Sequence, residues 1–209
     1  MSSTAQAHAG YDLTDVAAVF RSSLKLGVIE SVAVLLIGLA SRYLDGPVMT
    51  GAETVLLAAG LLAVTALPGL WTRARTIEGI AGAAGIGFGA TVVFLLIDVS
   101  LFQPFGLYTH RWRDVGGGSN WWYHPVWWMV GTYLPWFGAW ILANQTARNG
   151  APSVAGLAIW SFGFTAVCGA LAVVGHVPGA AWNLPTFGVA FLPGLALATL
   201  ASSMGSRRA

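Results

Sequence analysis

The sequence predicts an all-α integral membrane protein, folded as a polytopic bundle of about six transmembrane helices. Apolar residues make up 56% of the 209 residues and charged residues only 9%, whereas about 25% of residues are charged in an ordinary soluble domain. The mean hydropathy is +0.70. Such a chain has too little polar surface to cover itself in water, so we expect lipid to be its solvent. The net charge of +2 is too small and too dispersed to indicate a nucleic-acid partner.

Six apolar segments approach the length of about 20 residues that a helix needs to cross the hydrocarbon core. The expected spans are 26–43, 54–71, 77–102, 125–143, 153–174 and 184–204. The first, second and last are short, so the number falls to five if one of them is re-entrant. The substantial outer loop, 103–124, lies between the third and fourth spans, and a basic tail, 205–209, follows the last.

The first 25 residues predict a polar tail followed by a short amphipathic helix on the membrane interface. Asp12 is a plausible N-cap with Asp15 at the capping-box position, and apolar residues recur at helical spacing from Leu13 to Leu24. A helix of this kind can lie in the plane of the headgroups. The alternative is that the first span simply begins earlier.

Basic residues predict the orientation, because they accumulate in cytoplasmic loops. With six spans and both termini inside, seven of the ten basic residues lie on the cytoplasmic side. These are Arg21, Lys25, Arg73, Arg75, Arg148, Arg207 and Arg208. We therefore expect both termini in the cytoplasm, and the membrane to be the cytoplasmic (inner) membrane of a bacterium.

The third span is rich in small residues, and Ala81, Gly85 and Gly89 follow one another at i, i+4 and i+8. Small side chains in register allow a second helix to approach closely in lipid. This face predicts either a contact within the chain or a surface for another subunit.

Ionisable residues are expected only near the ends of the spans. Glu30 and Glu78 lie about one turn inside the cytoplasmic ends of the first and third predicted spans, and Glu53 lies at the outer start of the second. The middle third of each predicted span contains no Asp, Glu, Lys, Arg or His. Because ion-coupled transport uses such groups at membrane depth, the sequence argues against an ion-coupled transporter.

Asp98 is the carboxylate most in need of a partner, since apolar residues surround it about one turn from the outer end of the third span. Arg111 and Arg113, in the loop that follows, are the candidates for an ion pair with it.

The same loop contains His110, Asp114 and His124, whose side chains are ordinary metal ligands. Their spacing is not that of a known motif and two arginines lie close by, so hydrogen-bonded interfacial histidines are the favoured interpretation. His124 is also a candidate ligand or donor to a bound pigment, quinone or lipid headgroup.

Six of the ten tryptophans fall within Ser119–Trp140. Its first part is typical of an aromatic belt at the membrane–water interface. Tyr133, Trp136 and Trp140 extend deeper and share one helical face, which a headgroup belt does not explain. We expect a packed neighbour there: another subunit, a tightly held lipid or a flat hydrophobic cofactor.

Two functions follow as hypotheses. The favoured one is a non-catalytic integral membrane subunit or assembly partner of a larger membrane complex, which could be an energy-transducing complex. Its expected partners are other integral membrane subunits and lipids. The alternative is a membrane-embedded enzyme or binding protein for a hydrophobic substrate, with its site in the outer loop. We predict no catalytic residue and no cofactor, while a bound lipid, quinone or pigment stays open.

Overall fold

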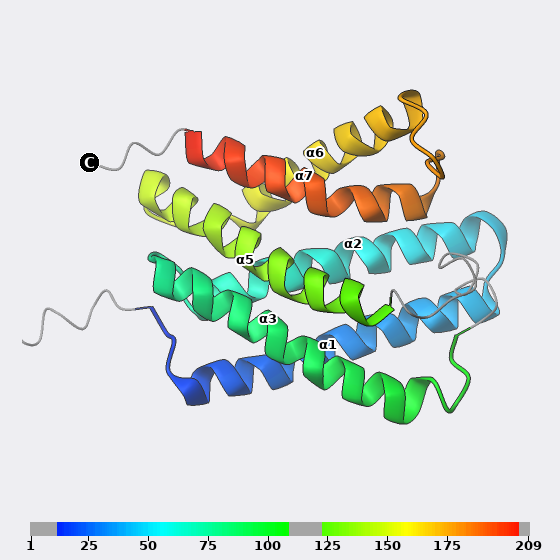
Figure 1. Cartoon of the computed structure of the whole chain (residues 1–209), viewed down its shortest axis with the longest axis horizontal. Coiled ribbons are helices and arrows are strands. Elements are labelled where there is room, and N and C mark those ends of the chain that lie inside the picture. Colours follow the sequence, from blue (N-terminus) through cyan, green and yellow to red (C-terminus); the bar gives the residue numbers. More distant parts are fainter. Residues whose placement is uncertain (1–11, 109–122, 205–209) are drawn as a thin grey trace, which may run out of the picture.

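All regular structure in the described part of the chain is helical. The computed structural model describes residues 12–108 and 123–204. Its elements in chain order are α1 (Val16–Tyr43), α2 (Gly46–Trp71), α3 (Ile77–Ile97), the π-helical turn η2 (Asp98–Phe102), α5 (Tyr123–Asn149), α6 (Val154–Val174) and α7 (Leu184–Met204). Figure 1 shows them as long, roughly aligned rods. The predicted all-helical fold is confirmed, and α3 with η2 covers the predicted third span.

Five of the helical segments in the described ranges are long and apolar enough to cross a membrane: α1, α2, α3 with η2, α6 and α7. Helix α5 is equally long, with 27 residues, but its tryptophans and tyrosines lower its mean hydropathy. The chain therefore has the architecture of a multi-pass membrane protein.

Helix α1 is continuous from Val16, ten residues before the predicted start of the first span. It begins there because the Asp15 carboxylate accepts a hydrogen bond from the Ala18 N–H, at 2.9 Å, in an N-cap. Arg21 and Lys25 are exposed on the same helix. Residues 16–25 are thus the first turns of the spanning helix, which is the second of the two interpretations of this segment.

Asp12, expected to cap α1, instead caps α3. Its carboxylate accepts hydrogen bonds from the backbone N–H groups of Arg75, Thr76 and Gly79, each at 3.0 Å, and from the Thr76 hydroxyl. The N–H of Gly79 lies in the first turn of α3 and those of Arg75 and Thr76 lie just before it, where no partner within the helix is available. The segment before α1 is thereby fastened to the start of α3.

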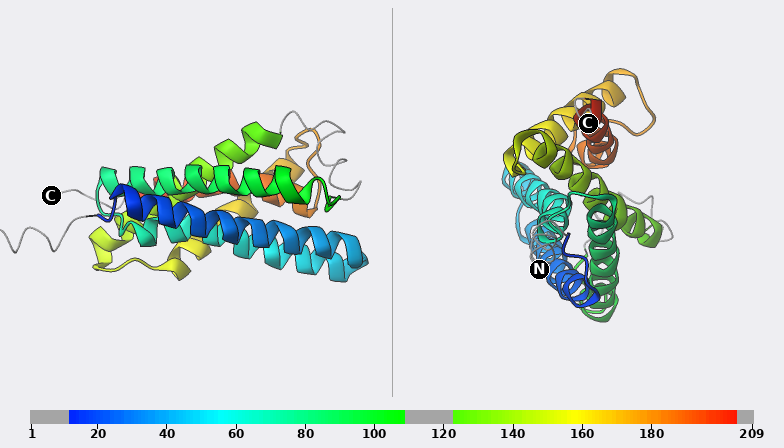
Figure 2. Two further views of the ribbon diagram at one scale, coloured as in Figure 1. Left: turned by 90° about the horizontal axis from the view of Figure 1, so that it is seen from below. Right: turned by 90° about the vertical axis from the view of Figure 1, so that its left-hand side faces the viewer.

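The helices form two groups. Helices α1, α2, α3 and α5 pack together, whereas α6 packs mainly against α7, and this hairpin lies beside α5 (Figure 2). The first and last described helical ends, of α1 and α7, lie at the same end of the bundle (Figure 1).

Glycines mark the closest approaches between helices. A Cβ atom on Gly87 of α3 would collide with the backbone oxygen of Gly131 on α5, and one on Gly138 would collide with the backbone of Thr65 on α2. On α1, a Cβ on Gly27 would lie 2.6 Å from the Cβ of Val93 on α3. Helix α5 therefore packs almost backbone to backbone against both α2 and α3, as small residues permit in lipid.

Candidate functional site

The predicted metal ligands and the predicted arginine partners of Asp98 lie outside the residues that the structure describes. His110, Arg111, Arg113 and Asp114 lie outside the described residues, as does the side chain of His124. Within the described ranges, no cluster of three His, Cys, Asp or Glu side chains could hold a metal ion. The metal-site and ion-pair hypotheses therefore stay predictions.

Asp98 has neutral hydrogen-bond partners from its own segment. The residue is fully buried at the start of η2. Its carboxyl accepts hydrogen bonds from the Gln103 side-chain amide, at 2.6 Å, and from the Tyr108 hydroxyl. The π-helical turn, closed by the Gln103 N–H on the Asp98 carbonyl at 2.9 Å, brings these donors back to the carboxyl. This arrangement closes the C-terminal end of α3 over a buried polar group, and its geometry is that of a structural cap.

The deeper aromatic residues of α5 contact one another in series. Tyr133 and Trp136 have ring centroids 5.8 Å apart, and Trp136 and Trp140 have theirs 5.9 Å apart. Trp136 and Trp140 pack against a cluster that includes Ile80 and Ala83 of α3, so part of the expected neighbour is the chain itself. Tyr133 is 41% exposed and has room for contact with another molecule.

The small residues on one face of α3, Ala81, Gly85 and Gly89, lie partly in a contact within the bundle and partly on its surface. A Cβ on Gly89 would lie 2.8 Å from the Ser23 Cβ of α1, so this position packs within the chain. Gly85 has no atom near its would-be Cβ, and Ala81 is exposed. Gly87, which is not on that face, packs closely against Gly131 of α5 instead.

Glu30 is the residue whose place in the structure differs most from its expected place. Because α1 begins at Val16 rather than near residue 26, Glu30 is its fifteenth residue of 28, about 21 Å from the helix start at 1.5 Å per residue. The structure therefore places Glu30 near the middle of α1, counted along the helix. The Glu30 side chain is only 6% exposed.

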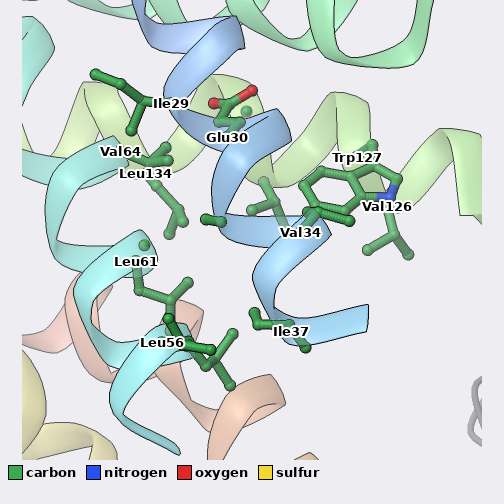
Figure 3. A pocket seen from close by; sticks show the side chains of 15 residues that line it. Ile29, Glu30, Val34, Ile37, Leu56, Leu61, Val64, Val126, Trp127 and Leu134 are labelled. Carbon is green, nitrogen blue, oxygen red and sulfur yellow. The ribbon is translucent and has the colours of Figure 1, made fainter. Parts of the chain in front are cut away.

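An apolar cleft of about 230 Å³ lies between α1, α2 and α5, and Glu30 is part of its wall (Figure 3). Its other walls include Ala33 of α1, Gly60 of α2 and Leu134 of α5. Figure 3 shows Glu30 at one end of the cleft with Ile29, Val64 and Leu134, while Ile37 and Leu56 lie at the other end. Among the described residues that line the cleft, Glu30 alone carries an ionisable group.

One oxygen of the Glu30 carboxyl lacks a hydrogen-bond partner within the described part of the bundle. Its Oε2 atom is buried and has no hydrogen-bond partner among the described residues. Burying a polar group without a hydrogen bond costs about 1–3 kcal/mol, and more when the group is charged. Ionisable groups within membrane-spanning helices are usually kept for a function. The cleft, whose lining is almost wholly apolar, could hold a small apolar molecule.

Sequence reasoning missed this site because it placed Glu30 close to the membrane surface. A signal was present: Ser23, Leu26, Gly27, Glu30, Ser31, Val34 and Gly38 recur at helical spacing, and all are buried. That recurrence places Glu30 on the internal face of α1. The cleft itself depends on how α2 and α5 pack, which the spacing cannot show.

The chain matches no known family model. Searches of the curated proteins and of the solved structures found no match either.

Proposed function

We propose that this chain is a non-catalytic integral membrane subunit or assembly partner of a larger membrane complex, which contacts other membrane proteins through helix faces at membrane depth. The observation that carries the proposal is a pair of glycines, Gly85 on α3 and Gly163 on α6, that lie in mid-helix with no atom of the described residues within 4 Å of a would-be Cβ. A glycine inside a helix costs about 1 kcal/mol relative to alanine. A close contact with a neighbouring helix, which the absence of a side chain permits, would offset this cost.

Helix α6 offers the broadest of these faces. It packs mainly against α7, and Ile159, Trp160, Val167 and Leu171 are 51–70% exposed on its other side. Gly163 lies among them. Lipid tails can cover the large side chains, whereas a helix partner would also use the space beside the glycine.

Tyr133 is a further candidate contact residue, on α5. It is 41% exposed and stacks on Phe137 with ring centroids 6.0 Å apart. A flat ring held in this way supports contact with a partner side chain, a tightly held lipid or a flat hydrophobic cofactor.

Site-specific photo-crosslinking in native membranes tests the proposal. A photoreactive amino acid at Gly85 or Gly163 should give a protein adduct of one defined mass. Val28, which is 51% exposed on α1, is the matched control and should give lipid adducts alone. The proposal fails if the glycine positions give no protein adduct, or the same adducts as Val28.

We also propose that the membrane is a bacterial cytoplasmic membrane with both termini inside. In that orientation the α2–α3 turn, with Arg73 and Arg75, and Arg148 at the end of α5 face the cytoplasm. Labelling of cysteines introduced at Arg73 and Asp45, with a reagent that cannot cross the membrane, would test the orientation.

The second candidate function is binding of a hydrophobic molecule. The observation that favours it is the apolar cleft between α1, α2 and α5, which lies within the helix bundle rather than in the loop between α3 and α5. A subunit can also bind a small molecule, so the two functions are compatible.

A further inference from the structure

We propose that one exposed face of α1 binds an anionic phospholipid. The phosphate of this lipid pairs with Arg21 and Lys25, and one of its acyl chains lies along Val28, Val32 and Leu36. The first half of α1 lies at the edge of the bundle (Figure 2). The inference concerns a lipid partner and depends on neither of the functions proposed above.

The five residues lie on one side of α1. Counted from Arg21, the others follow at i+4, i+7, i+11 and i+15, and residues with this spacing share a face of an α-helix. All five side chains are exposed. The face thus has two basic groups at one end and a row of aliphatic groups, Val28, Val32 and Leu36, below them.

The height of this face corresponds to one leaflet of a bilayer. Lys25 and Leu36 are 11 residues apart on α1, or about 16.5 Å at 1.5 Å per residue, and half of the hydrocarbon core is about 15 Å thick. Trp71, the last residue of α2, packs against the small cluster to which Leu26 belongs. Because tryptophan favours the headgroup level, this contact places Lys25 close to that level.

The negative charge of the lipid is inferred from the surroundings of Arg21 and Lys25. Like charges four residues apart repel one another on a helix, and no acidic residue lies three or four positions from either of them. The nearest acidic residues along α1 are Asp15, which caps the helix at the Ala18 N–H, and Glu30, which is buried. A phosphate between the two cations would accept charge-assisted hydrogen bonds from both.

Photoaffinity labelling of the full-length chain in lipid vesicles tests this inference. The probes are a phosphatidylglycerol and a phosphatidylcholine that carry a diazirine at the same acyl carbon, in vesicles of the two unlabelled lipids in equal amounts. Labelling of residues 21–36 is measured by mass spectrometry and divided by labelling of the exposed side of α6 around Ile159, a helix without basic residues. This ratio removes differences in probe concentration and reactivity.

The anionic probe should label residues 21–36 roughly tenfold more than the zwitterionic probe, after normalisation. Lys25→Gln and Arg21→Gln should each lower this preference about fivefold, as expected for the loss of one basic residue at an anionic membrane surface. Lys25→Arg should retain it.

Arg75→Gln is the matched control. It removes the same charge at the same end of the bundle, but from the turn between α2 and α3 (Figure 1). It should leave the preference of residues 21–36 unchanged, because a bound phosphate responds to its own two partners rather than to the total charge.

Three results would overturn the inference. Equal labelling by the two probes in the wild-type chain would reject an anionic lipid as the partner. A loss of preference in Arg75→Gln as large as that in Lys25→Gln would show that only the total charge attracts the lipid. Displacement of the anionic probe by inorganic phosphate, which has no acyl chain, would show that the apolar part of the face takes no part in binding.

Discussion

The hydroxyl of Tyr108 donates a hydrogen bond to the carboxyl of Asp98, ten residues earlier in the chain, across the π-helical turn at the end of α3. Asp98 is fully buried, and Gln103 supplies its other described donor. Carboxylates in membrane-spanning helices are usually paired, and here the described partners are neutral. Tyr108 also packs against a cluster formed by Val34, Phe94 and Leu95, so the contact ties the segment after α3 to the core.

Tyr108→Phe should destabilise the protein by about 1–3 kcal/mol, because it removes one of the donors to a buried carboxyl and leaves the ring in place. Thermal unfolding in detergent, followed by circular dichroism, measures the change. Tyr43→Phe is the control, since Tyr43 is 73% exposed at the end of α1. An equal effect of both substitutions would mean that the hydroxyl of Tyr108 contributes no specific stabilisation.

Asp12→Ala should cost about 1–2 kcal/mol of unfolding free energy, because it removes the cap of α3. Asp15→Ala removes the cap of α1 and provides the comparison. Hydrogen exchange separates the two: Asp12→Ala should raise exchange in the first turn of α3, near Gly79, and Asp15→Ala should raise it near Ala18. If Asp12→Ala instead affected the start of α1 alone, its assignment as the cap of α3 would be wrong.

Gly87→Ala should destabilise the bundle by about 1–3 kcal/mol, because the added methyl group would collide with the backbone of Gly131 and force α3 and α5 apart. Gly85→Ala, two residues earlier, should stabilise the isolated chain by up to about 1 kcal/mol, since its methyl group meets no atom of the chain. The midpoint of thermal unfolding for each variant, in the same detergent, gives the comparison. The opposite order of stability would contradict the described rotation of α3.

Glu30→Leu should stabilise the ligand-free protein by about 1–3 kcal/mol, because an apolar side chain of similar size replaces a carboxyl that has no described partner for its Oε2 atom. Chemical unfolding of the purified chain measures this. A loss of stability would indicate that the fold itself satisfies the carboxyl.

The sequence predicts the number and order of the helices well, because each needs a long apolar segment. The last two helices begin and end within one residue of their expected bounds. Helices α1 and α2 begin earlier than expected. A prediction from hydropathy ends a span at the first polar residues, whereas a helix with a favourable first turn can continue through them. In α2 this first turn contains Gly46 and Pro47, and Pro47 is well suited to that position.

The site could be predicted only in part, because a spacing of four residues does not tell which way a helix is rotated. Ala81, Gly85 and Gly89 do follow one face of α3, yet Gly87, which is not on that face, packs closely against Gly131 of α5. Asp12 has the sequence signature of an N-cap, but the helix that it caps lies more than sixty residues away. Glu30 appeared peripheral because the start of its helix was misplaced, and the cleft beside it exists only in the packed bundle.

The central claim is that this chain works in contact with other membrane proteins. The mass of the assembly released from native membranes tests it most directly. Native mass spectrometry of the tagged chain, extracted gently, should give a species heavier than the 21.8 kDa chain by at least one different protein subunit in fixed ratio. In Gly85→Leu, which fills the open space on α3, that species should decline in favour of the single chain. A wild-type protein found only at 21.8 kDa with bound lipid, or only as multiples of that mass, would contradict the account.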